Sequence, residues 1–395
     1  MLSIPESFED DYAGTTLVYG RGAVADLGAT LAEQGLERAV VVTGTNVGAN
    51  PAVMERVSAG LGDRLVSVFD ETTPQKLGAT VFDGIDVMRH TDPDVLVGVG
   101  GGSSLDVARQ MSVLAADGRS LEDLRNAARE GDLPPPDPGQ SPTDVVVVPT
   151  TFAGADVSSG GAIEVLSADE SPTGDPIRIR GTIRPTAVVH DPDLFETTPM
   201  GALAGSAMNG FDKGIETIYA RTATPITDAT AVRGLRLLRD ALPRLPDDPA
   251  AMERAVVGTI LVQYERRPSI VHALGHGFAE RYDIQQGIVH AVVVPHVLRF
   301  LFDRVDARRT VLAEGLGIDA EVMDEADLAV AIIEEVEAVR AALDLPDRLR
   351  DLVPTREDDL SAIARSILAD RMMDVAPAHL DPTVDDIEVV LTEAW

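Results

Sequence analysis

The sequence predicts an α/β domain built on a parallel sheet, followed by an all-α helical domain. The chain has 395 residues, 45% of them hydrophobic, which is enough for two packed domains. Short β-branched runs alternate with helical stretches in the first half, as in sheets that are buried on both faces. In the second half, apolar residues recur with the helical period. We therefore expect domains at 1–195 and 196–395.

The elements can be justified in chain order. Four apolar runs predict strands of the sheet: Ala39 to Thr43, Leu65 to Phe69, Val95 to Val99 and Val145 to Val148. The segment Asp132 to Pro142 holds five prolines, so we expect a surface excursion there. Ile177 to Arg180 and Thr186 to Val189 predict two more extended stretches. Later, one helical stripe ends before Pro346 and comprises Leu328, Ile332, Val336, Val339 and Leu343.

Composition excludes several classes of function. Subtracting 65 acidic from 33 basic residues leaves a net charge of −32, which disfavours nucleic acid and anionic membranes as partners. Cysteine is absent, which excludes disulfides and thiolate catalysis. No apolar run approaches the roughly 20 residues that span a bilayer. Met1 to Asp11 is polar and acidic and does not read as a leader, so we expect a cytoplasmic protein.

Lysine is rare in this chain. Of the 33 basic residues only Lys76 and Lys213 are lysines, and the other 31 are arginines. An acidic, lysine-poor composition is typical of halophilic proteins, because high salt screens the repulsion between carboxylates. The same scarcity means that each lysine needs a specific reason.

Two segments predict a site at the carboxyl ends of strands. In Val95 to Asp106 (VLVGVGGGSSLD), a strand runs into three glycines and a helix, a turn that can hold a pyrophosphate on free backbone N–H groups. An ordinary tight turn has the same pattern. In Pro149 to Ser159 (PTTFAGADVSS), a strand ends in small hydroxyl residues, which also fits a capped loop. Ligands of open parallel sheets lie at this edge.

The helical half carries a third group of residues. Asn209 and Lys213 lie in SAMNGFDKGIETIYA, and a histidine-rich stretch follows at residues 269–296. Its histidines are His272, His276, His290 and His296. His272 and His276 share a helix face, which suits a metal, although a structural or proton-relay role is equally open.

Together these motifs resemble the iron-containing alcohol dehydrogenase family, over nearly the whole chain. The matching segments are GGGSSLD, PTT, the Asp-Pro before the helical half, MNGFDKGIE and HALGH…QQGIVHAVVVPH. The resemblance implies a Rossmann-like domain that binds NAD or NADP, a helical domain that holds a divalent metal, and a carbonyl or alcohol substrate in the cleft between them. It also implies the architecture of dehydroquinate synthase and a homodimer or larger assembly.

Cofactor residues follow from that resemblance. Gly101, Gly102 and Ser103 would hold the pyrophosphate, Asp106 would fix the loop, and Thr150 and Thr151 would lie along the cofactor. The first strand ends at Gly44, Thr45 and Asn46, where family members that prefer NAD carry a carboxylate for the ribose. Without one, a 2′-phosphate fits, so we expect NADP or dual use.

The family's metal ligands are largely replaced. Aligned through Met208 and Glu216, an aspartate and three histidines become Asn209, Lys213, His272 and Gln286. An ammonium group repels a cation, so only His272, Asn209 and Gln286 could hold one, and we expect no metal. A frame that used Asp212 instead would turn the helix by roughly 300°. Glu216 already matches a glutamate that is not a ligand in the family, so we prefer the unshifted frame.

Motif spacing is closest to the maleylacetate reductase branch, which works without a metal. The PTT-FAG spacing, Asn209 and the stretch His290 to His296 match it, whereas Lys213 and Gln286 depart. We therefore expect an NAD(P)-dependent carbonyl or enone reductase. In it Lys213, oriented by Asn209 and Gln286, polarises the substrate oxygen, and His276 or His272 relays the proton.

Other interpretations stay open. Lys213 could simply pair with a carboxylate such as Asp212, Glu216 or Glu280, and His290 and His296 are expected to be structural. The activity could be that of an iron- or zinc-dependent alcohol dehydrogenase with unusual ligands, or of a dehydroquinate synthase-like cyclase. A degenerate dehydrogenase without catalytic activity is the non-enzymatic alternative.

Overall fold

The computed structural model describes residues 7–12, 14–137, 139, 141–245 and 248–395. It divides into two compact units. The α/β unit contains the described residues up to Thr151 and Ala155–Thr198, and the helical unit contains Phe152–Gly154 and Pro199–Trp395. The chain thus passes into the helical unit three residues beyond the predicted boundary at 195/196. Of the acidic N-terminal segment Met1 to Asp11, the first six residues lie outside the described part.

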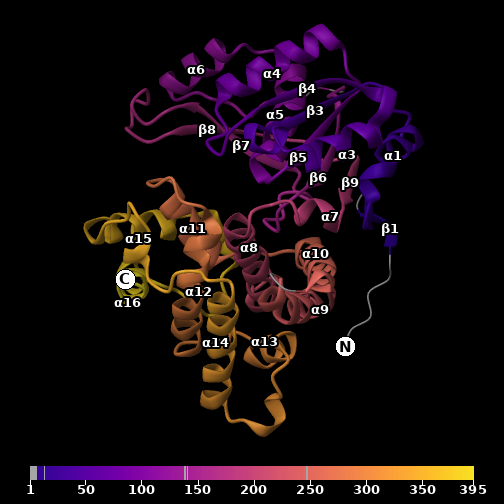
Figure 1. Cartoon of the computed structure of the whole chain (residues 1–395). Coiled ribbons are helices and arrows are strands. Elements are labelled where there is room, and N and C mark those ends of the chain that lie inside the picture. The colour runs from indigo at the N-terminus through magenta and orange to yellow at the C-terminus, as the bar shows by residue number, and fades with distance from the viewer. Residues whose placement is uncertain (1–6, 13, 138, 140, 246–247) are drawn as a thin grey trace. The chain divides into compact units, whose positions relative to one another are not determined.

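Seven strands form the main sheet of the α/β unit, in the order β1-β2-β9-β6-β5-β3-β4 (Figure 1). All neighbours are parallel except β1 and β2. The strands are β1 (Ser7–Tyr12), β2 (Thr15–Gly20), β3 (Ala39–Gly44), β4 (Leu65–Thr72), β5 (Val95–Gly100), β6 (Asp144–Pro149) and β9 (Ala187–His190). The four predicted strands are β3 to β6, and the second predicted extended stretch is β9. The predicted parallel sheet is confirmed.

Valines explain why these strands lie inside the sheet. Every residue of β5 and β9 is buried, as are the four valines of β6, so both faces need cover. Val41, Val97 and Val146 form one core with α3 (Pro51–Leu61). The other helices of this unit are α1 (Leu27–Glu33), α2 (Thr45–Gly48), α4 (Gly78–Thr91), α5 (Gly102–Asp117), α6 (Leu121–Glu130) and α7 (Pro192–Phe195).

Two further segments match their predictions. Among its described residues, the proline-rich segment Asp132 to Pro142 contains neither helix nor strand, while its residues 138 and 140 lie outside the description. The first predicted extended stretch is β8 (Ile177–Thr182), which forms an antiparallel hairpin with β7 (Gly160–Leu166).

Strand order reverses direction between β3 and β5. From β3 the chain moves outward to β4, and from β5 it moves the other way to β6 and β9. Such a switch point leaves space beyond the carboxyl ends of the two strands, where ligands bind in open α/β sheets.

The second unit is helical, as predicted. Its helices are α8 (Met200–Tyr219), α9 (Pro225–Ala241), α10 (Pro249–Tyr264), α11 (Ile270–Ala279), α12 (Gln286–Phe302), α13 (Arg309–Leu316), α14 (Glu325–Ala342), α15 (Leu360–Ala369) and α16 (Val384–Glu393). The predicted apolar stripe lies on α14, except that Leu343 is the residue just after the helix, and all of its residues are buried. Among the described residues, no helix has both the length and the apolar character needed to cross a bilayer.

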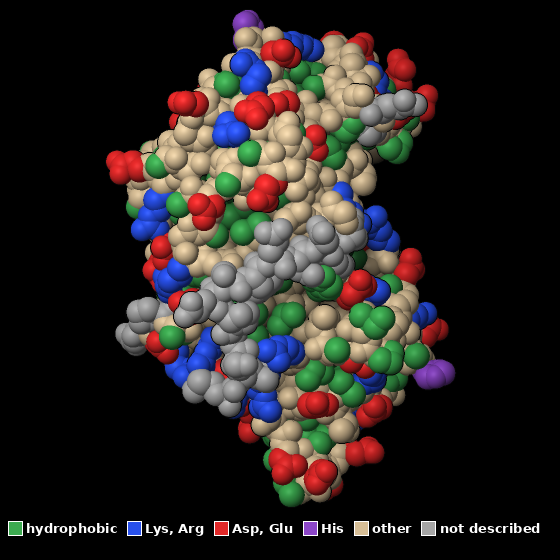
Figure 2. Space-filling model, turned by 90° about the vertical axis from the view of Figure 1, so that its right-hand side faces the viewer, with side chains coloured by type: hydrophobic (Ala, Val, Ile, Leu, Met, Phe, Trp, Pro, Cys, Tyr) green, Lys and Arg blue, Asp and Glu red, His purple; other side chains and the backbone are tan. Residues whose placement is uncertain are grey.

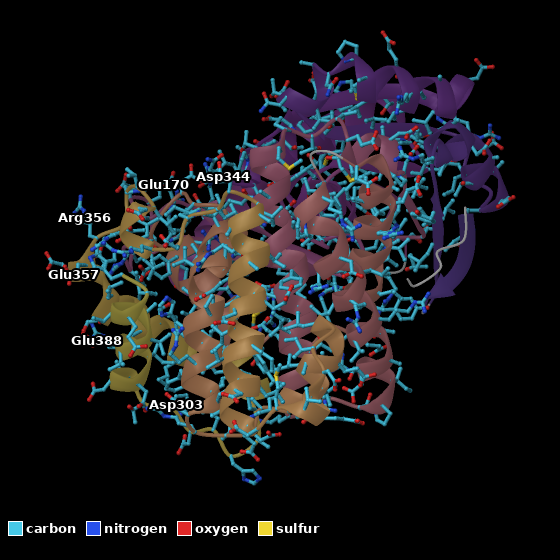
Figure 3. The ribbon with its side chains drawn as sticks, turned by 60° about the horizontal axis from the view of Figure 1, so that its bottom comes forward. Glu170, Asp303, Asp344, Arg356, Glu357 and Glu388 are labelled. Carbon is cyan, nitrogen blue, oxygen red and sulfur yellow. The ribbon has the colours of Figure 1, made fainter. Side chains whose placement is uncertain are left out.

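Acidic side chains are distributed over the surface of both units. Figure 2 shows them interspersed with basic ones over the visible face. Asp303 and Glu357 are exposed at the periphery of the helical unit (Figure 3). This distribution agrees with the excess of carboxylates in the sequence, and the halophilic character stays a prediction.

The central helix of the second unit is α8. Every residue from Leu203 to Tyr219 is buried, so neighbouring helices surround it. α12 approaches it closely at Gly287, where an added Cβ would lie 1.7 Å from the carbonyl oxygen of Gly205. This approach fixes the polar residues of α8 against the start of α12.

Replacing Gly287 with alanine should therefore destabilise the helical unit. The new methyl group meets backbone, which cannot rotate away, so we expect a loss of about 1–3 kcal/mol in the free energy of unfolding. Urea unfolding at fixed high salt measures it. Gly201→Ala is the control, because Gly201 lies at the exposed start of α8 and no atom lies within 4 Å of its added Cβ. Equal stability of the two variants would contradict the packing described.

Candidate functional site

In the α/β unit, three neighbouring strands end in the predicted cofactor residues. β5 pairs with β3 on one side and with β6 on the other, and the Thr150 N–H donates to the Gly100 carbonyl at 3.0 Å. This brings three segments to the same edge, at the switch point: Gly44, Thr45 and Asn46; Gly101, Gly102 and Ser103; Thr150 and Thr151. Their role as cofactor ligands stays a prediction.

The glycine turn suits a pyrophosphate. Gly100 has a φ of 130°, which favours glycine, and α5 begins two residues later. The first turn of α5, all of which is described, contains no acidic side chain. Its free N–H groups and positive dipole end are therefore available to an anion.

Asp106, one turn into α5, forms ion pairs with two basic residues. Its Oδ2 lies 3.0 Å from Lys76 Nζ, and its Oδ1 lies 3.3 Å from Nη1 of the fully buried Arg109. Gly161 leaves the room, because a Cβ there would lie 2.4 Å from Asp106 Cβ. Sequence reasoning identified Asp106 but not its partners. The rarity of lysine was the available signal for Lys76.

Asp70 places a carboxylate near the end of β3, where the sequence itself has Gly44, Thr45 and Asn46 and no acidic residue. It lies on β4, and its backbone carbonyl accepts from Thr45 Oγ1 at 3.1 Å. A Cβ on Gly48, in α2, would lie 3.1 Å from Asp70 Oδ2. The segment after β3 therefore has an acidic neighbour from the adjacent strand, a contact between strands that sequence order hides.

In the helical unit, the predicted catalytic residues come from three helices. Asn209 and Lys213 lie one turn apart on α8 and are 8% and 6% exposed, His272 is in the first turn of α11, and Gln286 begins α12. Lys213 Nζ donates to the carbonyl oxygen of Ala153. Asn209 Oδ1 and His272 Nε2 are buried and have no hydrogen-bond partner among the described residues.

His276 has a different environment. Its Nδ1 donates to Asp370 Oδ2 at 2.6 Å, and its side chain is 34% exposed. It lies one turn beyond His272 on α11 and pairs with the turn that follows α15. Its predicted part in a proton relay is not tested by this contact.

A buried polar cluster lies one turn further along α8 and α12. We call it the α8 cluster; its members are Asp212, Glu216, His272 and His290. His272 Nδ1 donates to Glu216 Oε2, and Glu216 Oε1 accepts from the N–H groups of Val271 and His272 at 2.8 and 3.1 Å. His290 Nδ1 contacts Asp212 Oδ2, and the two imidazole rings lie 4.7 Å apart.

Burial governs the titration of the α8 cluster. Asp212, Glu216 and His290 are fully buried, and His272 is 5% exposed. Burial raises the pKa of the Asp212 carboxyl well above its usual range and that of Glu216 to about 7. It lowers the pKa of His290 to about 3 and that of His272 well below its usual range. Each shift disfavours the charged form.

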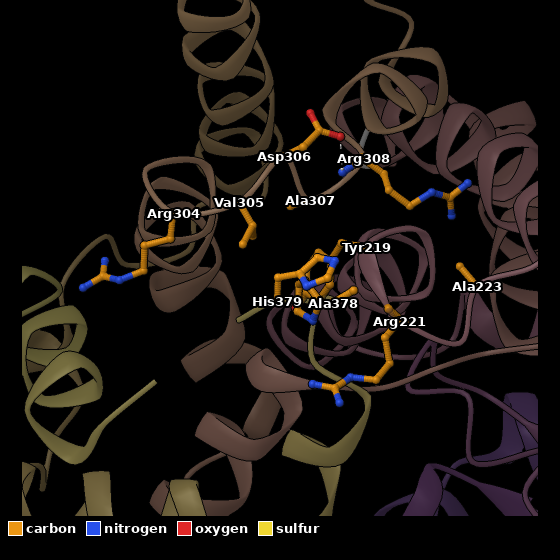
Figure 4. A pocket seen from close by; sticks show the side chains of 12 residues that line it. Tyr219, Arg221, Ala223, Arg304, Val305, Asp306, Ala307, Arg308, Ala378 and His379 are labelled. Carbon is orange, nitrogen blue, oxygen red and sulfur yellow. Dashed lines mark hydrogen bonds between the residues drawn. The ribbon is translucent and has the colours of Figure 1, made fainter. Parts of the chain in front are cut away.

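A separate hollow of about 480 Å³ lies at the end of α8 (Figure 4). Arg221, Arg304 and Arg308 line it, but their guanidinium groups are engaged elsewhere. Arg221 donates to the Ala376 carbonyl, Arg304 pairs with Asp386, and Arg308 pairs with Asp228. These three guanidinium groups are therefore not available to bind an anion in the hollow.

Comparison with known families decides which family the fold belongs to. The iron-containing alcohol dehydrogenase pattern matches residues 14–192, and the pattern of the C-terminal domain of Fe-containing alcohol dehydrogenases matches residues 203–395. The chain belongs to the iron-containing alcohol dehydrogenase family. It is therefore an oxidoreductase of the class that acts on alcohols and aldehydes.

Relatives span the whole chain. The NAD-dependent methanol dehydrogenase of Bacillus methanolicus is 27% identical over 95% of this chain and 97% of its own. Two solved structures share the fold: a 1,3-propanediol oxidoreductase (TM-score 0.84, 21% identity, all of both chains) and the maleylacetate reductase of Agrobacterium tumefaciens (TM-score 0.74, 23% identity, 100% of this chain and 99% of that one).

A divalent metal does not fit the family's usual position in this chain. Of the four aligned residues, Asn209 and Gln286 are neutral amides and Lys213 is a cation, so His272 is the one strong ligand. The α8 cluster has the opposite chemistry. Asp212, His272 and His290 can each bring one donor atom within 4.8 Å of the others, which is a donor set suited to zinc or iron.

The Asp370 carboxyl should make the stability of this family member depend on pH. Burial alone would raise the pKa of Asp370, but hydrogen bonds from His276 and the Met372 N–H, with the charges of His276 and Arg371, lower it. A carboxyl group with a lowered pKa stabilises the fold at pH values above its ordinary pKa, near 4. That contribution is lost as the pH falls through the lowered pKa. The melting temperature should therefore fall less steeply between about pH 6 and pH 3 in Asp370→Asn than in the wild type.

The control is Asp374→Asn, which changes an exposed neighbour of Asp370. Its melting temperature should fall with pH as steeply as that of the wild type. Identical slopes in all three proteins would contradict this role for Asp370.

Proposed function

We propose that this protein is an NAD(P)-dependent alcohol dehydrogenase or carbonyl reductase in which Lys213 stabilises the negative charge on the substrate oxygen. The observation that carries the proposal is a nearly buried ammonium group at a position where the family places a metal ligand. Family membership supplies the reaction class, and Lys213 is this chain's own addition.

Binding of the dinucleotide is assigned to the α/β unit. A nicotinamide dinucleotide supplies or accepts hydride when it is bound. The N–H groups of Gly101, Gly102 and Ser103 would hold its pyrophosphate at the start of α5, and the Lys76–Asp106 pair would keep that helix turn in place.

Lys213 acts on the oxygen of the carbonyl group. Reduction builds negative charge there, and a fixed cation stabilises that charge more than it stabilises the neutral carbonyl. At about 4 Å and an effective dielectric near 20, a unit charge contributes about 4 kcal/mol. That corresponds to roughly three powers of ten in rate. The Ala153 carbonyl accepts from the same ammonium group and orients it.

His272 is one of the two histidines considered for the proton relay, and in the oxidation direction it can accept the proton of the alcohol. Its Nδ1–H donates to Glu216, so the neutral ring carries its lone pair on Nε2, which is buried and unpaired among the described residues. His276 donates its own Nδ1–H to Asp370 in the same way, and its side chain is 34% exposed. In their neutral forms both rings therefore present Nε2 as the proton acceptor.

Lys213→Ala should lower turnover by about three powers of ten, because the stabilising charge is lost. The dinucleotide dissociation constant, measured by fluorescence titration, should stay within about twofold of the wild type, because Lys213 lies in the other unit. Added ethylammonium should restore part of the turnover. A variant with turnover within tenfold of wild type, or one that no amine rescues, would contradict the role of the charge.

Cofactor preference should depend on Asp70. We propose that its carboxylate accepts from a ribose 2′-hydroxyl and repels a 2′-phosphate, which favours NAD and revises the expectation of NADP. Asp70→Ser should raise the kcat/KM for NADPH relative to NADH on the order of tenfold. Glu71→Ser is the control, because successive strand residues point to opposite faces. Equal shifts in both variants, or none in Asp70→Ser, would contradict the assignment.

A further inference from the structure

The replaced ligand positions in this chain follow a regular pattern. Asn209, Lys213 and Gln286 stand where the family has metal ligands, and each is followed three or four residues later by a metal-binding side chain. The three pairs are Asn209 with Asp212, Lys213 with Glu216, and Gln286 with His290. Three to four residues are one helical turn, so the second set lies one turn further along α8 and α12.

We propose that Asp212, His272 and His290 form a divalent-cation site one helical turn deeper than the family's usual position. His272 takes part in both sets. It stands at a family ligand position, and it also brings a donor atom close to Asp212 and His290. Glu216 adds a second carboxylate beside His272. This set differs from the family's ligands at every position except His272.

Unpaired polar atoms support the site. Within the described part of the chain, Asp212 Oδ1, His272 Nε2 and His290 Nε2 are buried and have no hydrogen-bond partner, while Asp212 Oδ2 lies against His290 Nδ1. A buried carboxylate that is not fully paired costs several kcal/mol unless a cation compensates it. The one group in the described residues whose donor atoms converge in this way is Asp212, His272 and His290.

Helix packing makes room for the site. Gly275 on α11 faces His290, and a Cβ there would lie 2.1 Å from His290 Nε2. The glycine therefore allows α11 and α12 to bring their imidazoles together above α8. Any side chain at this position would push His290 away from Asp212.

The site is closed to substrate. Asp212, Glu216 and His290 are 0% exposed, and His272 is 5% exposed. Fully enclosed ligand sets are typical of structural metal sites, whereas catalytic ones keep an open position. The cation would thus join three helices through their side chains, and Lys213 would remain the group that acts on the substrate. With the cation bound, His272 Nε2 is a ligand, so the proton relay falls to His276. The inference stands whether or not Lys213 has that catalytic role.

Metal content tests the site directly. Wild-type protein purified without chelator or added metal should retain about one divalent ion per chain, measured by plasma mass spectrometry. Asp212→Asn and His290→Gln should retain less than about a tenth of that, because each removes one ligand. His296→Gln, a histidine on the same helix but outside the cluster, should keep the ion, and so should Lys213→Ala.

Two measurements use the wild-type protein alone, so their results do not depend on whether the variants fold. Removal of the ion by a chelator should lower the melting temperature of the wild type, and cobalt should restore it with the absorption bands of a tetrahedral site. Wild-type protein that retains no ion and binds no added cobalt would overturn the proposal. So would an unchanged ion content in both ligand variants. Failure of Lys213→Ala to lose activity would overturn the proposed function instead.

Discussion

The helical unit depends on how α8 accommodates charge in its buried interior. Asp212, Lys213 and Glu216 lie on a stretch of α8 in which every residue is buried. Isolated charges in such a place are strongly unfavourable, so each must find a partner on a neighbouring helix or loop. Glu216 receives N–H groups from the start of α11, and Lys213 reaches the Ala153 carbonyl. These contacts fix the positions of α11 and of Phe152–Gly154 around α8.

The need to pair buried charges also determines which nitrogen of His272 is free to react. Glu216 holds the Nδ1–H of His272, which leaves Nε2 as the free acceptor. The carboxylate therefore selects the tautomer of His272 and leaves Nε2 free to bind the proposed cation. Because Glu216 also receives the N–H groups at the start of α11, the orientation of His272 is coupled to the position of the whole helix.

Much of the fold was predictable because local patterns determine it. The valine runs of β3, β5 and β6 predict buried parallel strands, and the stripe on α14 predicts a helix. The α8 cluster was not, because it depends on the level at which three helices meet. Sequence reasoning considered Asp212 but set it aside on the assumption that α8 would have to rotate. No rotation is needed, since His290 lies one turn beyond Gln286 and meets Asp212 there. Asp70 was missed for a similar reason, because it reaches α2 from a neighbouring strand.

The two lysines of this chain have a practical consequence for chemical labelling. Lys76 stands beside the proposed dinucleotide turn, and Lys213 stands beside His272 and Asn209. Amine-directed reagents usually scatter over dozens of surface positions, but here arginine provides nearly all the positive charge and does not react with them. Apart from the α-amino group, acylation can modify only these two side chains. A nonselective reaction thus reports separately on the α/β unit and on the helical unit, with the more exposed Lys76 accessible first.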